Sequence, residues 1–577
     1  MINIHYKKRK KTFLNDKRLF LLFVAVVLIA FIIIIRLFIL QIIRGGKYSD
    51  MAFGRHNLST SIEAKRGEIF IQEFGSETLY PVATNKITYL VYAEPSKIQN
   101  KVMAAKVLAD NLELDEAELK KTLYKDDPYE PVAHYVSKEI MERIKAYGIK
   151  GVGFEEEVKR FYPEKGFGGH ILGFVGFDTN KQSGRYGLEG YFDEQLSGQS
   201  GYLKGEKDAL GRLIPWGDQA LEEAVDGTDF VLTVERGIQF FVCNKIKEAV
   251  KKYEASFGVV IVMEPNTGKV LAMCSSPDFD PNFYNKEKDQ SIFNNPAIFN
   301  QYEPGSVFKP ITMAAAIDAK LVSPESTYID EGEVYIEPHT IKNSDLKRYG
   351  VQTMTEVLEK SLNTGVVHVV KLLGPKKFRE YVNDFGFGNL TDIGLDKEAV
   401  GDISSLKKRG EIWSATASYG QGISVTPLQM LNAFNVLANG GKLMRPYIVE
   451  KIIGPGSIAQ ETSPKTIRQV ISSRTSVLLR GMLASVVENG HAKLAAVNGY
   501  YVGGKTGTAQ VSEGGEYAKE KKIATFAGFA PVDNPRFSVL IRLDNPQAVE
   551  WASDSAAPIF GEIAKYILNY LKVPSER

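Results

Sequence analysis

A serine and a lysine three positions apart, Ser306 and Lys309, could act as a nucleophile and its base. They lie in the segment EPGSVFKP, where Gly305 interrupts the chain just before an apolar run at 311–317 that predicts a buried helix. Residues i and i+3 of a helix share one face, so the lysine amine would lie beside the serine hydroxyl. The N-terminus of a helix favours negative charge near the serine, and partial burial keeps a lysine neutral. The pair predicts acyl transfer through Ser306, with Lys309 accepting its proton.

A second element, Ser361-Leu362-Asn363, lies between a helical pattern at 354–360 and an apolar helical pattern at 366–373. Alternate residues of a tight loop between helices can face one cleft. There the Ser361 hydroxyl could relay a proton, and the Asn363 amide could orient an amide of the substrate. Taken alone, the element is equally well explained by a serine or asparagine that caps a helix.

A third element, GGKTGTAQ at 503–510, has the composition of a strand. The two-residue period of a strand places Thr506 and Thr508 on one face and Lys505 on the other. Two hydroxyls on one face suit a carboxylate. The glycines, Gly507 among them, allow a substrate backbone to lie along the sheet edge as an added strand. A phosphate-binding loop is disfavoured, because no helix is expected after Lys505.

The order of the three elements makes the prediction specific. Each is a weak pattern that also arises by chance in 577 residues. In the order S-x-x-K, S-x-N, K-T-G they form the signature of penicillin-recognising serine enzymes. Their long separations leave room for a helical insertion between the two halves of a sheet.

Other catalytic and metal-binding patterns are weaker. The sequence has no G-x-S-x-G elbow, and His368 and His491 are interpreted as structural or surface histidines. Cys243 and Cys274 lack the spacing of a metal site and are interpreted as buried thiols rather than a disulfide. The sequence therefore predicts no metal and no cofactor. A net charge of +2 without a basic, aromatic-rich stripe excludes nucleic acid as a partner.

The elements around these motifs predict an α+β fold with one antiparallel sheet flanked by helices. A helix is expected at 238–253, followed by a β-hairpin at 257–275 that turns at Asn266-Thr267-Gly268. A helix-rich middle at 306–439 is followed by three strand-like runs (GYYVGGKTGTAQ, ATFAGFAPV and RFSVLIRLDN) and a closing helix at 557–571. The first two chemical elements thus lie in the helical insertion, and the third lies on the returning sheet.

The part of the chain before residue 226 carries no catalytic cluster. Residues 1–18 are basic, and residues 19–43 are an apolar stretch, interrupted by Arg36, that is long enough for a transmembrane anchor. The flanking lysines and arginines predict a cytoplasmic N-terminus, so that the remainder lies outside. Residues 44–225 mix short β-rich runs, helical stretches such as 102–124 and glycine-rich turns. They are predicted to form an elongated α+β pedestal below a catalytic domain at 226–577.

The whole chain resembles the class B penicillin-binding proteins, the monofunctional transpeptidases of bacterial cell-wall synthesis. The segments YEPGSVFKP, GKTGTAQ, SYGQGISVTPLQM and MEPNTGKVLAMCSSPDFDPN carry the resemblance in the catalytic region. In the pedestal it rests on RFYPEKGFGGHILGFVG and YGLEGYFDEQLSG. One departure is visible: Arg66-Gly67-Glu68-Ile69 is not followed by the usual Asp-Arg-Asn-Gly-like turn, which puts details of the pedestal contacts in doubt.

The resemblance implies a fold, a substrate and a mechanism. The catalytic domain would have the serine β-lactamase-like transpeptidase fold, and the substrate would be a peptidoglycan stem peptide that ends in D-Ala-D-Ala. Ser306 would attack the penultimate carbonyl with Lys309 as base, while the N–H groups of Ser306 and Thr508 form the oxyanion hole. Ser361, held by Lys309 and Lys505, would return a proton to the departing D-Ala.

The resemblance also implies further binding partners. Asn363 would hold the amide side of the donor, and Thr506 and Thr508 its carboxylate. β-Lactams would acylate the same serine. Because nothing in the sequence marks a glycosyltransferase, glycan chains would come from a partner, by analogy a multi-span membrane polymerase. The expected location is the bacterial plasma membrane, and SYGQGISVTPLQM favours the division or sporulation branch of the family.

Two other functions remain open. A β-lactamase shares the three elements but needs a dedicated base for rapid hydrolysis of the acyl-enzyme, and no glutamate of the insertion can be assigned to that task. A non-enzymatic β-lactam sensor should have several membrane spans, whereas this chain has one. A scaffolding role of the pedestal could coexist with catalysis.

Overall fold

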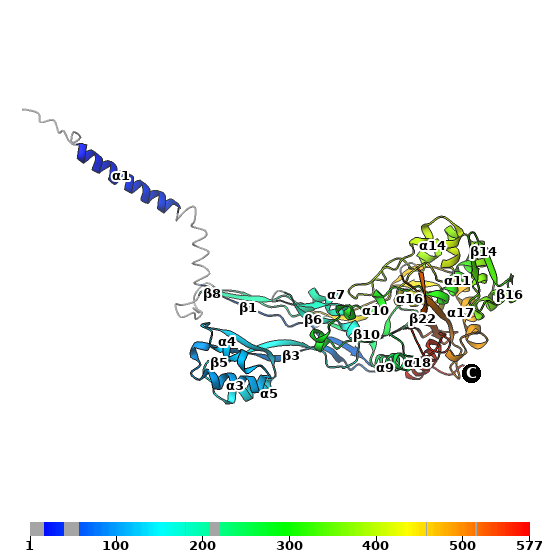
Figure 1. Cartoon of the computed structure of the whole chain (residues 1–577), viewed down its shortest axis with the longest axis horizontal. Coiled ribbons are helices and arrows are strands. Elements are labelled where there is room, and N and C mark those ends of the chain that lie inside the picture. Colours follow the sequence, from blue (N-terminus) through cyan, green and yellow to red (C-terminus); the bar gives the residue numbers. More distant parts are fainter. Residues whose placement is uncertain (1–16, 40–56, 179–180, 207–218, 457–458, 514–515) are drawn as a thin grey trace, which may run out of the picture. The chain divides into compact units, whose positions relative to one another are not determined.

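The computed structural model describes residues 17–39, 57–178, 181–206, 219–456, 459–513 and 516–577 of an α+β chain. The chain divides into two compact units, one made of residues 1–64 and 199–225 and the other of residues 65–198 and 226–577. Figure 1 shows the elements of both units.

The first unit holds one apolar helix and one small sheet. Helix α1 (Lys17–Phe38) contains a span of 19 residues, Phe20–Phe38, with a mean hydropathy of 3.2 and none of its residues buried. Among the described residues it is the one helix that is long and apolar enough to cross a membrane. The sheet has the antiparallel order β1 (Asn57–Ile62), β8 (Gly201–Glu206), β9 (Gln219–Glu222). The apolar helix expected from the sequence is therefore present.

A seven-stranded sheet runs through the second unit and joins segments that are far apart in sequence. Its order is β19 (Ala459–Glu461), β18 (Val449–Ile453), β10 (Asp229–Glu235), β2 (Ile69–Gln72), β3 (Tyr80–Ala93), β4 (Glu130–Val136), with β5 (Val152–Phe161) also paired to β3. Strands on both sides of residue 226 thus share one sheet. The division of the chain at that residue stays a prediction.

Three helices pack beside the far end of this sheet: α3 (Lys101–Leu112), α4 (Glu116–Leu123) and α5 (Lys138–Ala146). The helical pattern at 102–124 is broken in two because Glu113 adopts a left-handed conformation with φ of 56°. Asp115 then caps the second helix by accepting a hydrogen bond from the N–H of Glu118.

A buried ionic cluster ties the RGEI segment to the rest of this region. The Glu189 carboxylate has no exposed surface and accepts hydrogen bonds from Arg66 Nε at 2.7 Å and Arg160 Nε at 2.6 Å. Burial opposes its ionisation, but the charges of Arg160 and Arg66 outweigh burial and lower the pKa of Glu189. Gly67 must be glycine, because a Cβ there would lie 1.9 Å from the Thr228 carbonyl oxygen. The contacts of Arg66 and Gly67 are therefore well defined despite the atypical residues that follow them.

The expected antiparallel catalytic sheet is present with five strands. Its order is β12 (Val270–Ser276), β11 (Phe257–Met263), β23 (Phe537–Asp544), β22 (Glu516–Ala530), β21 (Gly503–Glu513), so that β21 is an edge strand. The predicted hairpin is β11–β12, with Gly258 opposite Ser276. Helices α9 (Arg236–Lys252) and α18 (Ala556–Tyr570) pack against this sheet, where Phe526 of β22 contacts Phe560 of α18.

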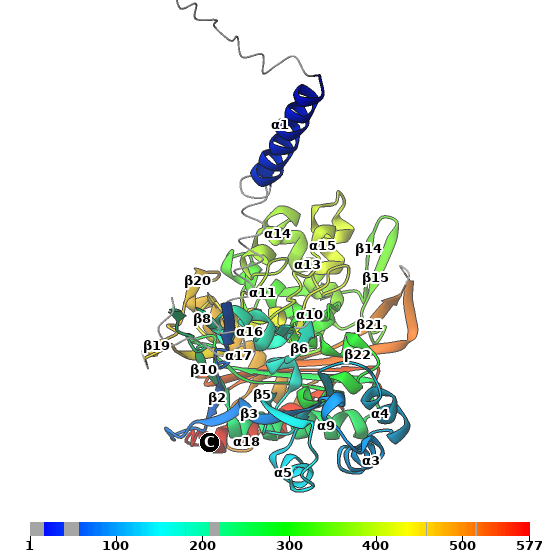
Figure 2. The same cartoon turned by 90° about the vertical axis from the view of Figure 1, so that its left-hand side faces the viewer.

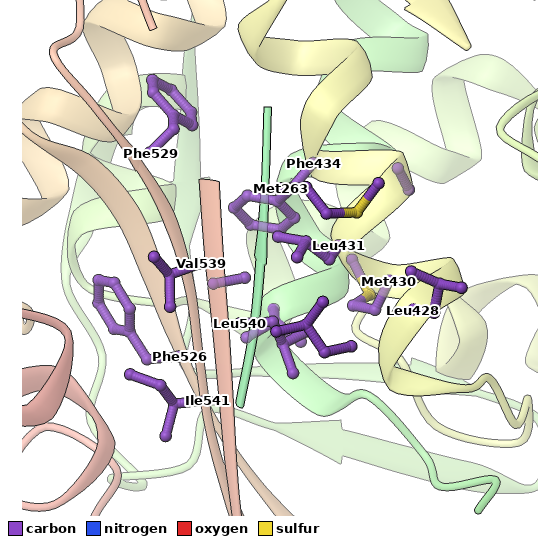
Figure 3. Packing of buried hydrophobic residues seen from close by; sticks show 14 of the residues in the cluster. Met263, Leu428, Met430, Leu431, Phe434, Phe526, Phe529, Val539, Leu540 and Ile541 are labelled. Atoms are coloured by element: carbon purple, nitrogen blue, oxygen red, sulfur yellow. The ribbon is translucent and has the colours of Figure 1, made fainter. Parts of the chain in front are cut away.

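The helical insertion covers the other face of this sheet. Figure 3 shows Leu431 and Phe434 of α16 (Pro427–Ala438) beside Met263 and Leu540, while Phe526 lies on the opposite side of the strands. The insertion also contains α11 (Lys309–Asp318), α12 (Met354–Glu359), α13 (Asn363–Leu373), α14 (Pro375–Asp384), α15 (Glu411–Ala417) and α17 (Ser473–Glu488). A hairpin of β14 (Glu333–Ile336) and β15 (His339–Lys342) projects from these helices (Figure 2).

The interpretation of both cysteines as free thiols was wrong. Cys243 of α9 and Cys274 of β12 form a disulfide, with their Cα atoms 5.3 Å apart. Helix α9 packs along β12, which brings together two residues separated by 31 positions. This proximity arises from helix-on-sheet packing, so the spacing of the two cysteines could not reveal it.

Replacement of Glu189 by glutamine is expected to destabilise the protein by roughly 3–5 kcal/mol, because the buried Arg160 loses its counter-charge and Arg66 keeps only its ion pair with Asp193. Chemical unfolding of the full chain in detergent measures this effect. The matched control is Glu118→Gln, since Glu118 pairs with Lys121 at an exposed site and should contribute at most about 1 kcal/mol. Equal effects of the two substitutions would show that the cluster does not hold the region together.

Candidate active site

Ser306 lies in a tight 3₁₀ turn, Gly305–Phe308, that leads directly into α11. Gly305 has φ of 58°, and its N–H donates to the carbonyl of Gly420 at 3.0 Å. A Cβ at Gly420 would lie 2.3 Å from the Gly305 carbonyl oxygen, so both positions require glycine. Ser306 is half-buried, whereas Gly305 and Val307 are fully buried. The turn therefore presents one hydroxyl from an otherwise packed segment at the start of a helix, as the sequence predicted.

Lys309 is the first residue of α11 and has no exposed surface. Its Nζ donates to the carbonyl oxygen of Ser361 and to Ser361 Oγ at 3.1 Å. Burial, together with the charge of Lys505, lowers the pKa of Lys309 well below its usual value. Burial thus favours the neutral form of this amine, which is hydrogen-bonded to a hydroxyl with which it can exchange a proton.

The Ser361 loop connects α12 to α13 in a strained conformation. Ser361 has φ of 56°, in the left-handed region that non-glycine residues seldom adopt. Asn363 starts α13, and its Nδ2 donates to the carbonyl of Lys342 at 2.9 Å. The N-cap position of α13 is Leu362, which has no capping side chain, so neither Ser361 nor Asn363 serves as a helix cap here. The capping explanation of this element is therefore wrong.

Strand β21 carries the third element along the edge of the catalytic sheet. Lys505 is fully buried, and its Nζ donates to the carbonyl of Thr506 at 3.1 Å. Burial lowers the pKa of Lys505 to about 7. Thr508 is half-buried, and its Oγ1 accepts a hydrogen bond from the N–H of Ala552 at 3.2 Å.

The glycines of β21 allow a close approach to the nucleophile turn. A Cβ at Gly507 would lie 3.0 Å from Val307 Cγ1 and 3.1 Å from the Pro304 carbonyl oxygen. A Cβ at Gly305 would similarly lie 3.1 Å from the Cβ of Ala509. The sequence predicted that these glycines make room for a substrate backbone. In the structure, Gly507 makes room for the turn that carries Ser306.

The fold thus brings all three elements to one place. The Lys309 amine bridges the first element to the second, the charge of Lys505 acts on Lys309, and Gly507 packs against the first element. The same region contains the predicted site residues Ser306, Lys309, Ser361, Asn363, Lys505, Thr506, Gly507 and Thr508. In the described part of the chain, no group of three or more histidine, cysteine or acidic residues could hold a metal ion.

Several residues of this region were not identified from the sequence. Partial burial and the charges of Lys505 and Lys309 lower the pKa of His491, so this histidine is within electrostatic range of the two lysines. Trp551 is 45% exposed and precedes Ala552, whose N–H binds Thr508. Neither residue belongs to a recognisable motif, and each lies in a loop distant in sequence from Ser306 and Ser361.

Residues 499–506 (GYYVGGKT) match the glycine and lysine spacing of a phosphate-binding loop. Such a loop places its lysine at the start of a helix. Here Gly503 to Glu513 form strand β21, and Lys505 lies opposite Ala527 of β22. The strand excludes a phosphate-binding loop, as the expected absence of a helix had indicated.

Two family models and several known bacterial proteins are similar to this chain. A family model described as the penicillin binding protein transpeptidase domain matches residues 258–565, and one described as the penicillin-binding protein dimerisation domain matches residues 61–232. Stage V sporulation protein D of Bacillus subtilis is 36% identical over 565 residues, which cover 96% of this chain and 86% of that protein. Peptidoglycan D,D-transpeptidase FtsI of Escherichia coli is 29% identical over 506 residues, 85% of this chain and 82% of that protein.

Solved structures extend the similarity to three dimensions. A crystal structure of penicillin binding protein 3 from Mycobacterium tuberculosis, complexed with aztreonam, superposes with a TM-score of 0.69 at 26% sequence identity. The match covers 90% of this chain and 98% of that chain.

Replacement of Lys505 by methionine is expected to change how stability depends on pH. The folded-state pKa of about 7 lies below the ordinary lysine value of 10.5, so between these values the unfolded chain binds more protons. The stability of the natural protein should therefore rise with pH relative to the variant, by at most about 1.4 kcal/mol per pH unit. Thermal unfolding of both proteins from pH 6 upward measures the difference. Lys121→Met, at an exposed position, is the control for loss of a lysine, and a difference for Lys505→Met that stays constant with pH would contradict burial of a neutral amine.

Proposed function

We propose that Ser306 is the residue that becomes acylated by the substrate. The chain belongs to the class B penicillin-binding proteins and is a peptidoglycan D,D-transpeptidase. The observation that carries this proposal is the contact between the elements. The turn that presents Ser306 packs against Gly507, and the adjacent lysine amine is buried on Ser361. A lysine whose pKa is lowered by burial can take the proton of a serine, and Lys309, three positions after Ser306, is such a lysine.

We propose that acylation starts with proton transfer from Ser306 Oγ to the neutral amine of Lys309. The oxygen then attacks the carbonyl carbon of the penultimate D-alanine, and the backbone N–H groups of Ser306 and Thr508 stabilise the oxyanion. When the C–N bond to the terminal D-alanine breaks, the leaving nitrogen takes a proton through Ser361. The hydrogen bonds from Lys309 to Ser361 support this route.

Deacylation forms the cross-link. The amine of a second stem peptide attacks the acyl-enzyme carbonyl and loses a proton, the bond to Ser306 Oγ breaks, and the serine regains its proton. Lys505, whose pKa is lowered to about 7, provides a second amine in this region that can exchange protons near neutral pH.

Substrate binding would use three further side chains. Asn363 would bind the amide side of the donor, because its position is fixed by a hydrogen bond to Lys342 and the rest of its amide stays available. Thr506 and Thr508 would bind the terminal carboxylate through their hydroxyls. A donor peptide running along the edge strand β21 would meet both.

β-Lactams would acylate the same serine, since the similar mycobacterial protein is complexed with aztreonam. The strained amide of the drug takes the place of the D-Ala-D-Ala bond. A transpeptidase is expected to retain the resulting acyl group, whereas a β-lactamase hydrolyses it.

The membrane arrangement is also a proposal. Helix α1 would span the bilayer once, with residues 1–18 in the cytoplasm and the catalytic region outside, as the basic N-terminal flank supports. Residues 44–225 would form the pedestal domain and residues 226–577 the transpeptidase domain. The two family matches, at 61–232 and 258–565, support such a division. A multi-span membrane polymerase would supply the glycan strands. One relative is stage V sporulation protein D and another is the transpeptidase FtsI, and both support a role in sporulation or division.

Replacement of Ser306 by alanine should abolish covalent labelling by a fluorescent penicillin, because no oxygen remains to form the ester. Gel detection of labelled full-length protein measures this, and Ser404→Ala, at an exposed serine outside the three motifs, should label normally. Stoichiometric labelling of the Ser306 variant would refute the assignment. Release of bound drug from the natural protein within seconds would instead favour a β-lactamase.

Replacement of Lys309 by methionine should slow acylation by a penicillin roughly 100- to 10,000-fold, the usual contribution of a general base. Methionine has a similar length and suits a buried site, so the fold should be retained. Stopped-flow acylation measures the rate, with Lys371→Met on the exposed side of α13 as the control. A rate within a few-fold of the natural enzyme would assign the base to another residue.

A further inference from the structure

A buried carboxylate lies behind the Ser361 loop on strand β13 (Thr327–Asp330). Asp330 has no exposed surface and accepts hydrogen bonds from Thr364 Oγ1 at 2.6 Å, the N–H of Tyr349 at 2.9 Å and Asn343 Nδ2 at 3.1 Å. Among the described residues, no lysine, arginine or histidine forms an ion pair with it. A buried charge without a counter-ion is costly unless fixed dipoles surround it, and here those dipoles come from groups next to the active site.

Asn343 transmits this arrangement to helix α13. Its Nδ2 donates to Asp330, so its Oδ1 faces the helix and accepts hydrogen bonds from the N–H of Asn363 at 3.0 Å and the N–H of Thr364 at 3.3 Å. Because Leu362 offers no capping side chain, Asn343 caps α13 from 20 positions earlier in the chain. The partial positive charge of that helix end also stabilises the carboxylate behind it.

The same segment fixes the Asn363 side chain. The carbonyl of Lys342 accepts one N–H of the Asn363 amide at 2.9 Å, and the neighbouring Asn343 holds the Asn363 backbone. The second N–H and Oδ1 of Asn363 remain for the substrate, and together they match the C=O and N–H of a peptide bond. A small displacement of Asn343 would therefore move both the backbone and the amide of Asn363.

We propose that Asp330 is a positioning residue that orients the Asn363 amide through Asn343 and Thr364, and so determines how well the enzyme accepts acyl donors that carry an amide group. The inference rests on the proposed role of Asn363 in binding the donor. Asp330 itself is separated from the substrate by these residues, so its effect should depend on whether the donor uses Asn363 at all.

Two β-lactams distinguish this role from a general loss of structure. Benzylpenicillin has an acylamino side chain, whereas imipenem has a hydroxyethyl group in its place. In Asp330→Asn the acylation rate constant should fall about tenfold or more with benzylpenicillin, the usual effect of a lost hydrogen bond to a charged group, and about threefold or less with imipenem. The control Glu331→Gln removes an exposed carboxylate one position away and should leave both rates unchanged.

A double-mutant cycle tests the route through Asn343. Asn343→Ala alone should show the same selective loss with benzylpenicillin, and adding Asp330→Asn to it should slow benzylpenicillin acylation by no more than about threefold further, because the two residues act through one hydrogen-bonded chain. An equal loss with both drugs in Asp330→Asn, or fully additive losses in the double variant, would overturn the proposal. Failure of the natural enzyme to be acylated by either drug would instead refute the proposed function on which the inference rests.

Discussion

Two lysine side chains, Lys309 and Lys505, are completely buried where the nucleophile turn, the Ser361 loop and strand β21 meet. A charged amine in such surroundings would be costly, so burial shifts both lysines toward the uncharged form that holds hydrogen bonds. The structure provides acceptors for both amines, in Ser361 for Lys309 and in Thr506 for Lys505. Burial lowers the pKa of Lys309 and lowers that of Lys505 to about 7, and the rest of the catalytic region maintains that burial.

Close packing of small residues makes this burial possible. Gly305 and Gly420 bring the nucleophile turn against the loop before α16, and Gly507 brings β21 against Val307. Each contact is too tight for a side chain. Behind them, α16 packs its apolar face on the catalytic sheet, which gives the turn a rigid base (Figure 3). The strained backbone of Ser361 persists because its surroundings hold it, through the buried Asp330 and Asn343 on one side and the Lys309 amine on the other.

Neutral and ionic clusters play different parts in the second unit. Around Glu189, two arginines neutralise a buried carboxylate and join the RGEI segment to the helices that follow it, which is a contribution to stability. Around Asp330, neutral donors and a helix end take the place of arginines. The second arrangement lies directly behind Asn363, where a fixed geometry is more important than net stabilisation.

Local pattern in the sequence was sufficient for much of this protein. The apolar N-terminal helix, the β11–β12 hairpin, the returning strands β21, β22 and β23, and the ordered motifs around Ser306, Ser361 and Lys505 are all short-range features of chemistry or periodicity. Only the tertiary structure decided the contacts between distant segments. These are the disulfide of Cys243 with Cys274, the capping of α13 by Asn343, and the close packing of Gly507 against Val307. These depend on which surfaces pack together, and residue spacing along the chain carries no direct record of that packing.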